Sequence, residues 1–169
     1  YIEKGYENLL LQSNNFDTSP WEVAGTSVTG GQAGYDGSND AWLLTSTTTG
    51  FPRIAQNVSY TGVASYSVYL KAGTDSFAQV RTFGISASIW VELTGDGTIS
   101  ATSGEIYHSI TSLGNGWYRV QMSVNGSLTS VRIYPASAVG AYSTSGNGIL
   151  IQDAMLNQGL VAYPYIETT

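Results

Sequence analysis

The chain has 169 residues, of which 11% are charged, and it carries a net charge of −6 and no cysteine. This length suits one domain with its own hydrophobic core, and the absence of cysteine excludes disulfides, a thiolate nucleophile and thiolate metal sites. The acidic balance argues against a nucleic-acid partner, and no apolar run approaches the ~20 residues of a membrane-spanning helix, so we expect neither nucleic-acid binding nor membrane insertion.

The two ends of the chain share a tripeptide. Tyr-Ile-Glu occupies residues 1–3 and again residues 165–167. We interpret residues 1–7 as a linker or the tail of a preceding module, and residues 8–169 as a single β-module. Neighbouring modules of the same parent chain are therefore expected partners.

Alternation of apolar and polar residues dominates the chain and predicts short strands. The predicted strands are Trp21–Thr29, Asp40–Ser46, Arg53–Ser59, Ala64–Ala72, Phe77–Phe83, Ser86–Thr94, Glu105–Leu113, Gly116–Val124, Ser130–Pro135 and Gly148–Leu156. Turn signals lie between them, including Gly95-Asp96-Gly97 and Asn125-Gly126-Ser127, whose Asp-Gly and Asn-Gly pairs suit hairpin turns. No window carries a clear helical stripe. The fold class is therefore all-β, an antiparallel two-sheet β-sandwich of jelly-roll type.

Strand parity places most of the cations away from the core. Where Tyr66, Val68 and Leu70 face the core, Tyr69 and Lys71 face the other way. The same argument puts the following residues on non-core faces: Arg53, Gln79, Arg81, Phe83, Trp117, Arg119, Gln121, Arg132 and Tyr134. Among the acids, Glu92 stands in mid-strand and shares its parity with Trp90. A face of arginine, glutamine and aromatic side chains suits a carbohydrate, because aromatic rings cover its C–H patches and planar polar groups bind its hydroxyls or carboxylates. The alternative is ordinary solvated sheet faces, where such residues pair well across strands.

Five segments resemble a known kind of module. They are Asn8–Phe16, Tyr66–Gly73, Gly114–Arg119, Ile133–Ala136 and Gly148–Leu156. Together they resemble modules repeated in bacteriophage tail-fibre and virion proteins, which in turn are similar to the jelly-roll carbohydrate-binding modules of xylanases and glucanases. The resemblance implies a glycan-binding module in a virion or extracellular protein, with a polysaccharide or cell-surface glycan as its ligand.

The resemblance also implies binding residues. In the enzyme-attached modules an aromatic residue at the place of Tyr69 is typically a sugar-stacking platform, so Tyr69 is the first candidate. The full set of candidate glycan contacts is Tyr69, Lys71, Gln79, Arg81, Phe83, Trp90, Arg119, Gln121, Arg132 and Tyr134. A buried aromatic ladder is the competing explanation for Trp90 and for Trp117.

A structural calcium is the cofactor that the resemblance implies. Its matching ligands are Asp17, the turn that contains Ser38 and Asp40, and Asp153. Calcium prefers six to eight oxygen ligands, which carboxylates and turn carbonyls can supply. The chain departs from many relatives by carrying Gln152 before the last-strand acid. The alternative is that Asp17 caps a turn and that Asp153 pairs with a backbone amide.

Catalysis is not expected. His108 is the only histidine, and no nucleophile elbow is present. Tyr69-Leu70-Lys71-Ala72-Gly73 superficially resembles a strand motif of jelly-roll alginate lyases, but Ile106-Tyr107-His108 stands where those enzymes carry Gln-x-His. We therefore rank three functions: a non-catalytic glycan-binding module first, a structural spacer or decoration domain without a ligand second, and a polysaccharide lyase third.

Overall fold

The computed structural model describes residues 7–169, and the regular structure in that range is entirely β. The strands are β1 (Trp21–Ala24), β2 (Thr26–Gln32), β3 (Ala41–Ser46), β4 (Arg53–Ala72), β5 (Phe77–Gly84), β6 (Ala87–Glu92), β7 (Thr98–Ser103), β8 (Tyr107–Ser112), β9 (Trp117–Ala138), β10 (Ala141–Tyr142) and β11 (Gly148–Gln158). The predicted all-β sandwich is confirmed. The described residues contain no helix that could cross a membrane. The predicted linker lies outside them except for Glu7.

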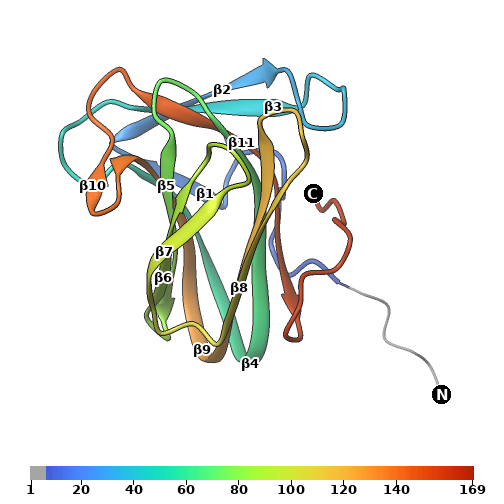
Figure 1. The fold of residues 1–169 in the computed structure, drawn as a ribbon. Helices are drawn as coiled ribbons and strands as arrows, with labels where there is room; N and C mark the ends of the chain where they lie inside the picture. The colour runs from blue at the N-terminus through green and yellow to red at the C-terminus, as the bar shows by residue number, and fades with distance from the viewer. Residues whose placement is uncertain (1–6) are drawn as a thin grey trace.

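Two long strands belong to both layers of the sandwich (Figure 1). Residues 64–72 of β4 and 117–124 of β9 pair in one layer, with β11, β3 and β2 on one side and β8 on the other. We call this layer sheet A. Residues 53–57 of β4 and 130–136 of β9 pair in the second layer, sheet B, between β1 on one side and β5, β6 and β7 on the other. The short β10 pairs with the end of β9.

The passage of β4 and β9 between the layers corrects the predicted strand boundaries. The predicted strands Arg53–Ser59 and Ala64–Ala72 form one long strand, β4, and Gly116–Val124 and Ser130–Pro135 form β9. The ladder between β4 and β9 continues through Gly62 opposite Gly126. Both glycines have positive φ, at 134° and 159°. This backbone freedom lets the chain change layer while keeping its partner. The predicted turn at Asn125-Gly126 is therefore wrong.

Two further boundaries differ from prediction. Gly25, with φ of 60°, divides the predicted Trp21–Thr29 strand into β1 on sheet B and β2 on sheet A. The strand Thr98–Ser103 was not predicted. It is a largely exposed edge strand that pairs only with β6 among the described strands, so its sequence lacks the apolar alternation of a half-buried strand.

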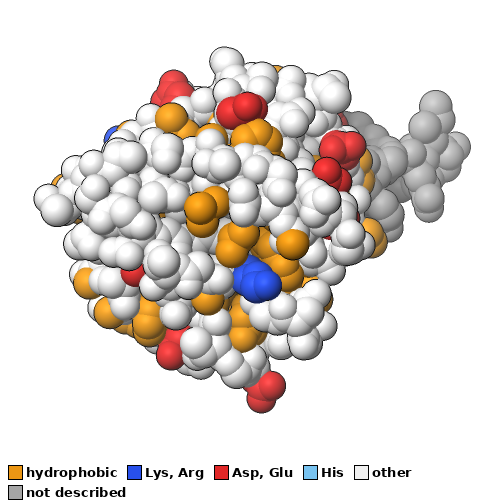
Figure 2. All heavy atoms as spheres, turned by 90° about the horizontal axis from the view of Figure 1, so that it is seen from above, with side chains coloured by type: hydrophobic (Ala, Val, Ile, Leu, Met, Phe, Trp, Pro, Cys, Tyr) orange, Lys and Arg blue, Asp and Glu red, His pale blue; other side chains and the backbone are white. Residues whose placement is uncertain are grey.

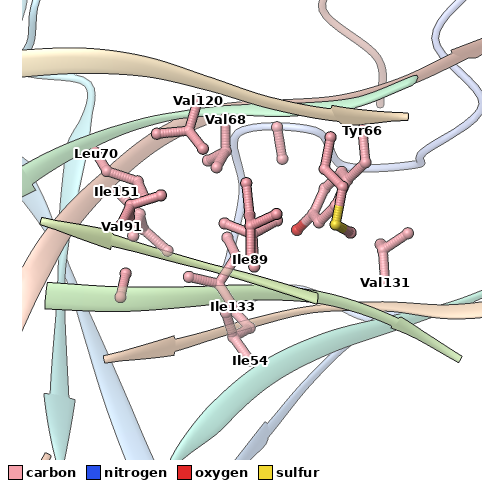
Figure 3. Packing of buried hydrophobic residues seen from close by; sticks show 14 of the residues in the cluster. Ile54, Tyr66, Val68, Leu70, Ile89, Val91, Val120, Val131, Ile133 and Ile151 are labelled. Carbon is pink, nitrogen blue, oxygen red and sulfur yellow. The ribbon is translucent and has the colours of Figure 1, made fainter. Parts of the chain in front are cut away.

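The core lies between the inner faces of the two sheets (Figure 3). Tyr66, Val68 and Leu70 of sheet A face Ile54 and Ile133 of sheet B, and all five are almost completely buried. The parity prediction for these residues is confirmed. Burial of each such aliphatic side chain stabilises the fold by about 1.5–3 kcal/mol.

The first and last segments of the described chain bind each other beside β11. The side chain of Asn8 donates to the carbonyls of Ala154 and Ile166, and the amide of Thr168 donates to the hydroxyl of Ser13. The amide of Ala154 donates in turn to the carbonyl of Ser13, at the irregularity in β11. These contacts hold the segment around Asp153 in place.

Candidate functional site

The ten predicted glycan contacts lie on the outer faces of two different sheets. Parity is right for each strand, because every one of them belongs to the non-core side. The four on sheet A are Tyr69, Lys71, Arg119 and Gln121. The six on sheet B are Gln79, Arg81, Phe83, Trp90, Arg132 and Tyr134. The predicted candidates therefore do not share one face: β4 and β9 deliver their two halves to opposite sides of the sandwich, which parity alone cannot reveal.

On sheet A, Tyr69 lies directly opposite Arg119, and Lys71 lies opposite Trp117. The ring of Tyr35, which sequence analysis missed, stacks on Tyr69 with centroids 3.7 Å apart and planes 6° apart. The guanidinium carbon of Arg119 lies 5.5 Å from the same ring centroid. One face of the predicted stacking platform is thus already covered by a protein ring.

A C-terminal segment, residues 159–163, lies across the same outer face; we call it the strap. The amide of Ala162 donates to Gln121 Oε1 at 3.1 Å, and the guanidinium of Arg119 donates to the carbonyl of Tyr163. The hydroxyl of Ser123 donates to the carbonyl of Leu160. The strap therefore binds Arg119, Gln121 and Ser123, and Nε of Arg119 and Nε2 of Gln121 are buried without a hydrogen-bond partner.

On sheet B, Arg81 and Arg132 are direct cross-strand partners on β5 and β9. Both guanidinium groups lie over the ring of Phe83, with their carbons 4.5 and 4.1 Å from its centroid. Arg132 also donates to the hydroxyl of Tyr134 at 3.2 Å. All three residues of this arginine–phenylalanine group are partly exposed.

Beside this group lies an aromatic cluster of Trp90, Tyr134, Tyr142 and Phe51. Tyr142 stacks on Trp90 and Tyr134, with centroids 5.3 and 4.9 Å away, and Phe51 meets it edge-on at 5.6 Å. Trp90 and Tyr134 are almost fully buried, whereas Tyr142 is half-buried and Phe51 is 67% exposed. Buried Trp90 and Tyr134 therefore support the more exposed rings of Tyr142 and Phe51. The burial of Trp90 agrees with the alternative considered from sequence, a buried aromatic ladder. Trp117, on sheet A, is buried as well.

Polar groups connect the aromatic cluster to the arginines. The hydroxyl of Tyr142 donates to Gln79 Oε1 at 2.6 Å. Burial raises the pKa of Tyr142 above its ordinary value, while the neighbouring charge of Arg81 and a hydrogen bond with it act in the opposite direction. Sequence analysis missed Tyr142 and Phe51 because both lie outside the predicted strands. The only sequence feature that could have identified them as candidate contacts is that each is an aromatic residue within a segment of small and polar residues.

The surface of the module is sparsely charged. Figure 2 shows a largely uncharged face with scattered acidic groups and basic atoms set among hydrophobic ones. Among residues 7–169 the only ion pair is between Glu105 and His108, at 2.5 Å. The arginines of sheet B therefore have no carboxylate partner within ion-pairing distance.

Among the predicted calcium ligands, Asp153 lies at the irregularity in the middle of β11. Asp153 has φ of 50°, and its carboxylate accepts a 2.7 Å hydrogen bond from the hydroxyl of Tyr35. Burial raises the pKa of Asp153 to about 6, and the nearby charges of Asp36, Glu167 and Asp40 act in the same direction. The surroundings of Asp153 thus disfavour the ionised form of its carboxyl group.

The remaining predicted ligands have other partners. Asn14 connects two of the positions, since it donates to the carbonyl of Asp40 and accepts from the amide of Asp153. The hydroxyl of Ser38 donates to Asp36, and the exposed Asp17 accepts from Thr18. A polar hollow of about 130 Å³ lies beside Asp40 and is lined by Asn14, Asn15, Gly31, Asn39, Asp40 and Trp42.

The fit of these residues to calcium is poor. In the described part of the chain no group of three or more acidic, histidine or cysteine side chains is arranged to hold a metal ion. Calcium binding stays a prediction from the resemblance, and an unchanged melting temperature in chelator would count against it.

Comparisons with known proteins give structural likeness only. No family model matches the chain, and no curated protein matches it significantly. The enzymatically active domain of tailspike protein 4 of bacteriophage CBA120 is similar with a TM-score of 0.50 and 16% identity, over 88% of this chain and 21% of that one. This chain thus spans about a fifth of the length of the tailspike structure.

Two carbohydrate-binding modules are also among the similar structures. TmCBM61, solved in complex with β-1,4-galactotriose, has a TM-score of 0.49 and 14% identity, over 90% of this chain and 99% of that one. A family 35 module from Paenibacillus barcinonensis has a TM-score of 0.41 and 13% identity, over 83% and 94%. The likeness to the tailspike domain confirms, for the fold alone, the resemblance to phage modules that the sequence predicts.

Proposed function

We propose that this module binds a glycan without catalysis, through the outer face of sheet B. The observation that supports this most is the aromatic cluster, in which Phe51 and Tyr142 are presented to solvent on top of buried Trp90 and Tyr134. A ring held by stacking loses little conformational freedom when it binds, and its face complements the C–H patches of a sugar ring.

Hydrogen-bonding groups stand next to these rings. Gln79, Arg81 and Arg132 lie on the same outer face. Gln79 is directly opposite Trp90 and Tyr134, and the two arginines lie two residues further along the strands. Planar amide and guanidinium groups bind pairs of hydroxyls or acidic groups with defined geometry. A sugar stacked at the cluster meets such donors at its edge.

Sheet A is the weaker candidate for the same function. The strap engages Arg119 and Gln121, and Tyr35 covers one face of Tyr69. A ligand on this face has to displace contacts that the folded chain already makes.

The described geometry also argues against the lyase alternative. His108 pairs with Met122, so its strand position has core-facing parity, whereas Tyr69 belongs to the outer face of the same sheet. The imidazole is bound to Glu105. A tyrosine and a histidine that act on one substrate need to share a face.

We further propose that the parent protein is a multi-module virion or extracellular protein. The support is the resemblance of five segments to modules of such proteins and a fold shared with a tailspike domain. Several weak sites on one parent bind a polymer more tightly than one site alone, through high effective concentration.

Native affinity gels that contain individual neutral and anionic polysaccharides test the proposal. We expect at least one polymer to retard the protein, Phe51→Ala and Tyr142→Ala to lose the retardation, and Tyr107→Ala to keep it. Tyr107 is a matched control because it is 41% exposed on β8, away from sheet B.

Two results would contradict the proposal. Indifference to every polymer would leave the spacer function. Loss of retardation in Tyr69→Ala together with full retardation in Phe51→Ala would move the site to sheet A.

A further inference from the structure

The pairing of Arg81 with Arg132 is the feature of sheet B that the proposed function does not explain. The two residues are direct cross-strand neighbours, and both approach the ring of Phe83. Like charges directly opposite each other on a sheet destabilise it. The arrangement therefore costs stability unless something neutralises it.

Among the described residues no acidic side chain neutralises the pair. Arg132 donates to the hydroxyls of Ser130 and Tyr134, and Arg81 lies near the hydroxyl of Tyr142, which itself donates to Gln79. The acid on the same row, Glu22, lies opposite Ala55 and is separated from Arg132 by β4. In residues 7–169 neither arginine has a carboxylate within ion-pairing distance.

The guanidinium of Arg81 is also incompletely satisfied. Its Nε is buried and has no hydrogen-bond partner. The chain carries twelve acidic residues against six basic ones, so carboxylates are abundant, yet none within residues 7–169 pairs with these arginines. A cationic pair without counterions on an acidic protein is the arrangement expected of an anion site.

We propose that this pair, which we call the arginine pair, binds the carboxylate or sulfate group of an anionic polysaccharide; the inference rests on the glycan-binding function proposed above. Two adjacent guanidinium groups offer parallel N–H donors that match the oxygens of either group.

The position of the arginine pair relative to the aromatic cluster supports this ligand class. The hydroxyl of Tyr142 donates to Gln79, which lies two residues from Arg81 on β5, and Arg132 donates to the hydroxyl of Tyr134. A sugar ring stacked on Tyr142 thus has its substituents directed toward the arginines. The aromatic cluster supplies ring contact, and the arginine pair supplies selection for charge.

The test compares polymers that differ only in charge. Polygalacturonate is compared with its carboxyl-reduced form, and dextran sulfate with dextran, by affinity electrophoresis and calorimetry. We expect at least one charged polymer to bind about tenfold or more tightly than its neutral counterpart, and this preference to weaken with salt. The polymer preferred distinguishes carboxylate from sulfate recognition, and either supports the proposal.

Variants assign the preference to the arginine pair. Arg81→Gln and Arg132→Gln should each weaken binding of the charged polymer about tenfold. Gln158→Glu, at an exposed position of β11 in sheet A, makes the same change in net charge and should leave binding unaltered. Arg81→Lys and Arg132→Lys keep the charge, and they should recover binding only in part because they lose the planar donor geometry. Melting temperatures establish that each variant is folded.

The outcomes separate the two proposals. Equal affinity for charged and neutral forms overturns the arginine-pair inference and leaves glycan binding in place. Charge preference that persists in both glutamine variants also overturns it. Binding to no polymer at all overturns both.

Discussion

Tyr35 donates its hydroxyl to Oδ2 of Asp153 across 2.7 Å, which joins the loop before β3 to the irregularity in β11. Burial raises the pKa of Asp153 to about 6, and the hydrogen bond from Tyr35 partly offsets that increase. The folded protein therefore holds a proton at Asp153 that the unfolded chain has already released between pH 4 and pH 6.

The first prediction concerns pH. Since the folded-state pKa of Asp153 is the higher one, the free energy of unfolding falls as pH rises from about 4 through 6 and levels off above it, a loss of about 2 kcal/mol. Urea unfolding at pH 4.5 and pH 7.5 measures the difference. Asp153→Asn should remove most of it, and an identical slope in that variant would contradict the assignment.

The second prediction concerns Tyr35→Phe. The variant removes the hydrogen bond that lowers the pKa of Asp153, so the midpoint of the pH transition should move upward. At pH 7.5 the ionised carboxylate loses a donor, and we expect a destabilisation of about 1–3 kcal/mol. At pH 4.5 the cost should be smaller. A pH-independent cost would show that the ring stacking on Tyr69, which the phenylalanine retains, was disturbed instead.

The third prediction separates the buried and exposed members of the aromatic cluster. Trp90→Ala removes a buried side chain and should cost about 3–5 kcal/mol, whereas Phe51→Ala should change stability by no more than about 0.5 kcal/mol. Both should weaken glycan retardation. If Phe51→Ala destabilises as strongly as Trp90→Ala, Phe51 is a packing residue and its exposure does not indicate a ligand contact.

The fourth prediction concerns the close approach of β11 and β3 at Gly148. A Cβ added there would lie 2.0 Å from the carbonyl oxygen of Leu44. Because backbone of a paired strand cannot give way, Gly148→Ala should destabilise the protein by about 2 kcal/mol or more. Gly50→Ala is the control, since its Cβ would meet only the side chain of Thr48 at 3.5 Å. Equal melting temperatures for the two variants would contradict the packing argument.

The fifth prediction concerns the strap. Gln121→Ala removes the acceptor for the amide of Ala162, so hydrogen exchange at Ala162 should become faster while the core amide of Val120 stays protected. Mass spectrometry of peptides from both segments measures this. Unchanged exchange at Ala162 would mean that the remaining contacts of the strap hold it without Gln121.

Sequence analysis predicted the core better than the site. Alternation in a strand decides which side chains face inward, so Tyr66, Val68 and Leu70 were placed correctly. Alternation does not record which sheet a segment joins. Tyr69 and Arg132 therefore share a parity class and lie on opposite sides of the sandwich.

Loops account for the other differences. Trp90 and Trp117 have outward parity, yet both are buried because residues outside the predicted strands cover them. Tyr142 covers the first and Tyr35 packs against the second. Such contacts join residues far apart in sequence, with no periodic pattern that could reveal them. The same reason explains why Phe51 and Tyr142 were not among the predicted contacts.

The long β4–β9 ladder has a consequence for how the module loses its structure. Each of these strands contributes hydrogen bonds to both layers. One layer therefore cannot unfold alone without breaking the β4–β9 pairing that continues into the other layer. We therefore expect a single cooperative transition, in which tryptophan fluorescence and circular dichroism change together, and no populated half-unfolded intermediate.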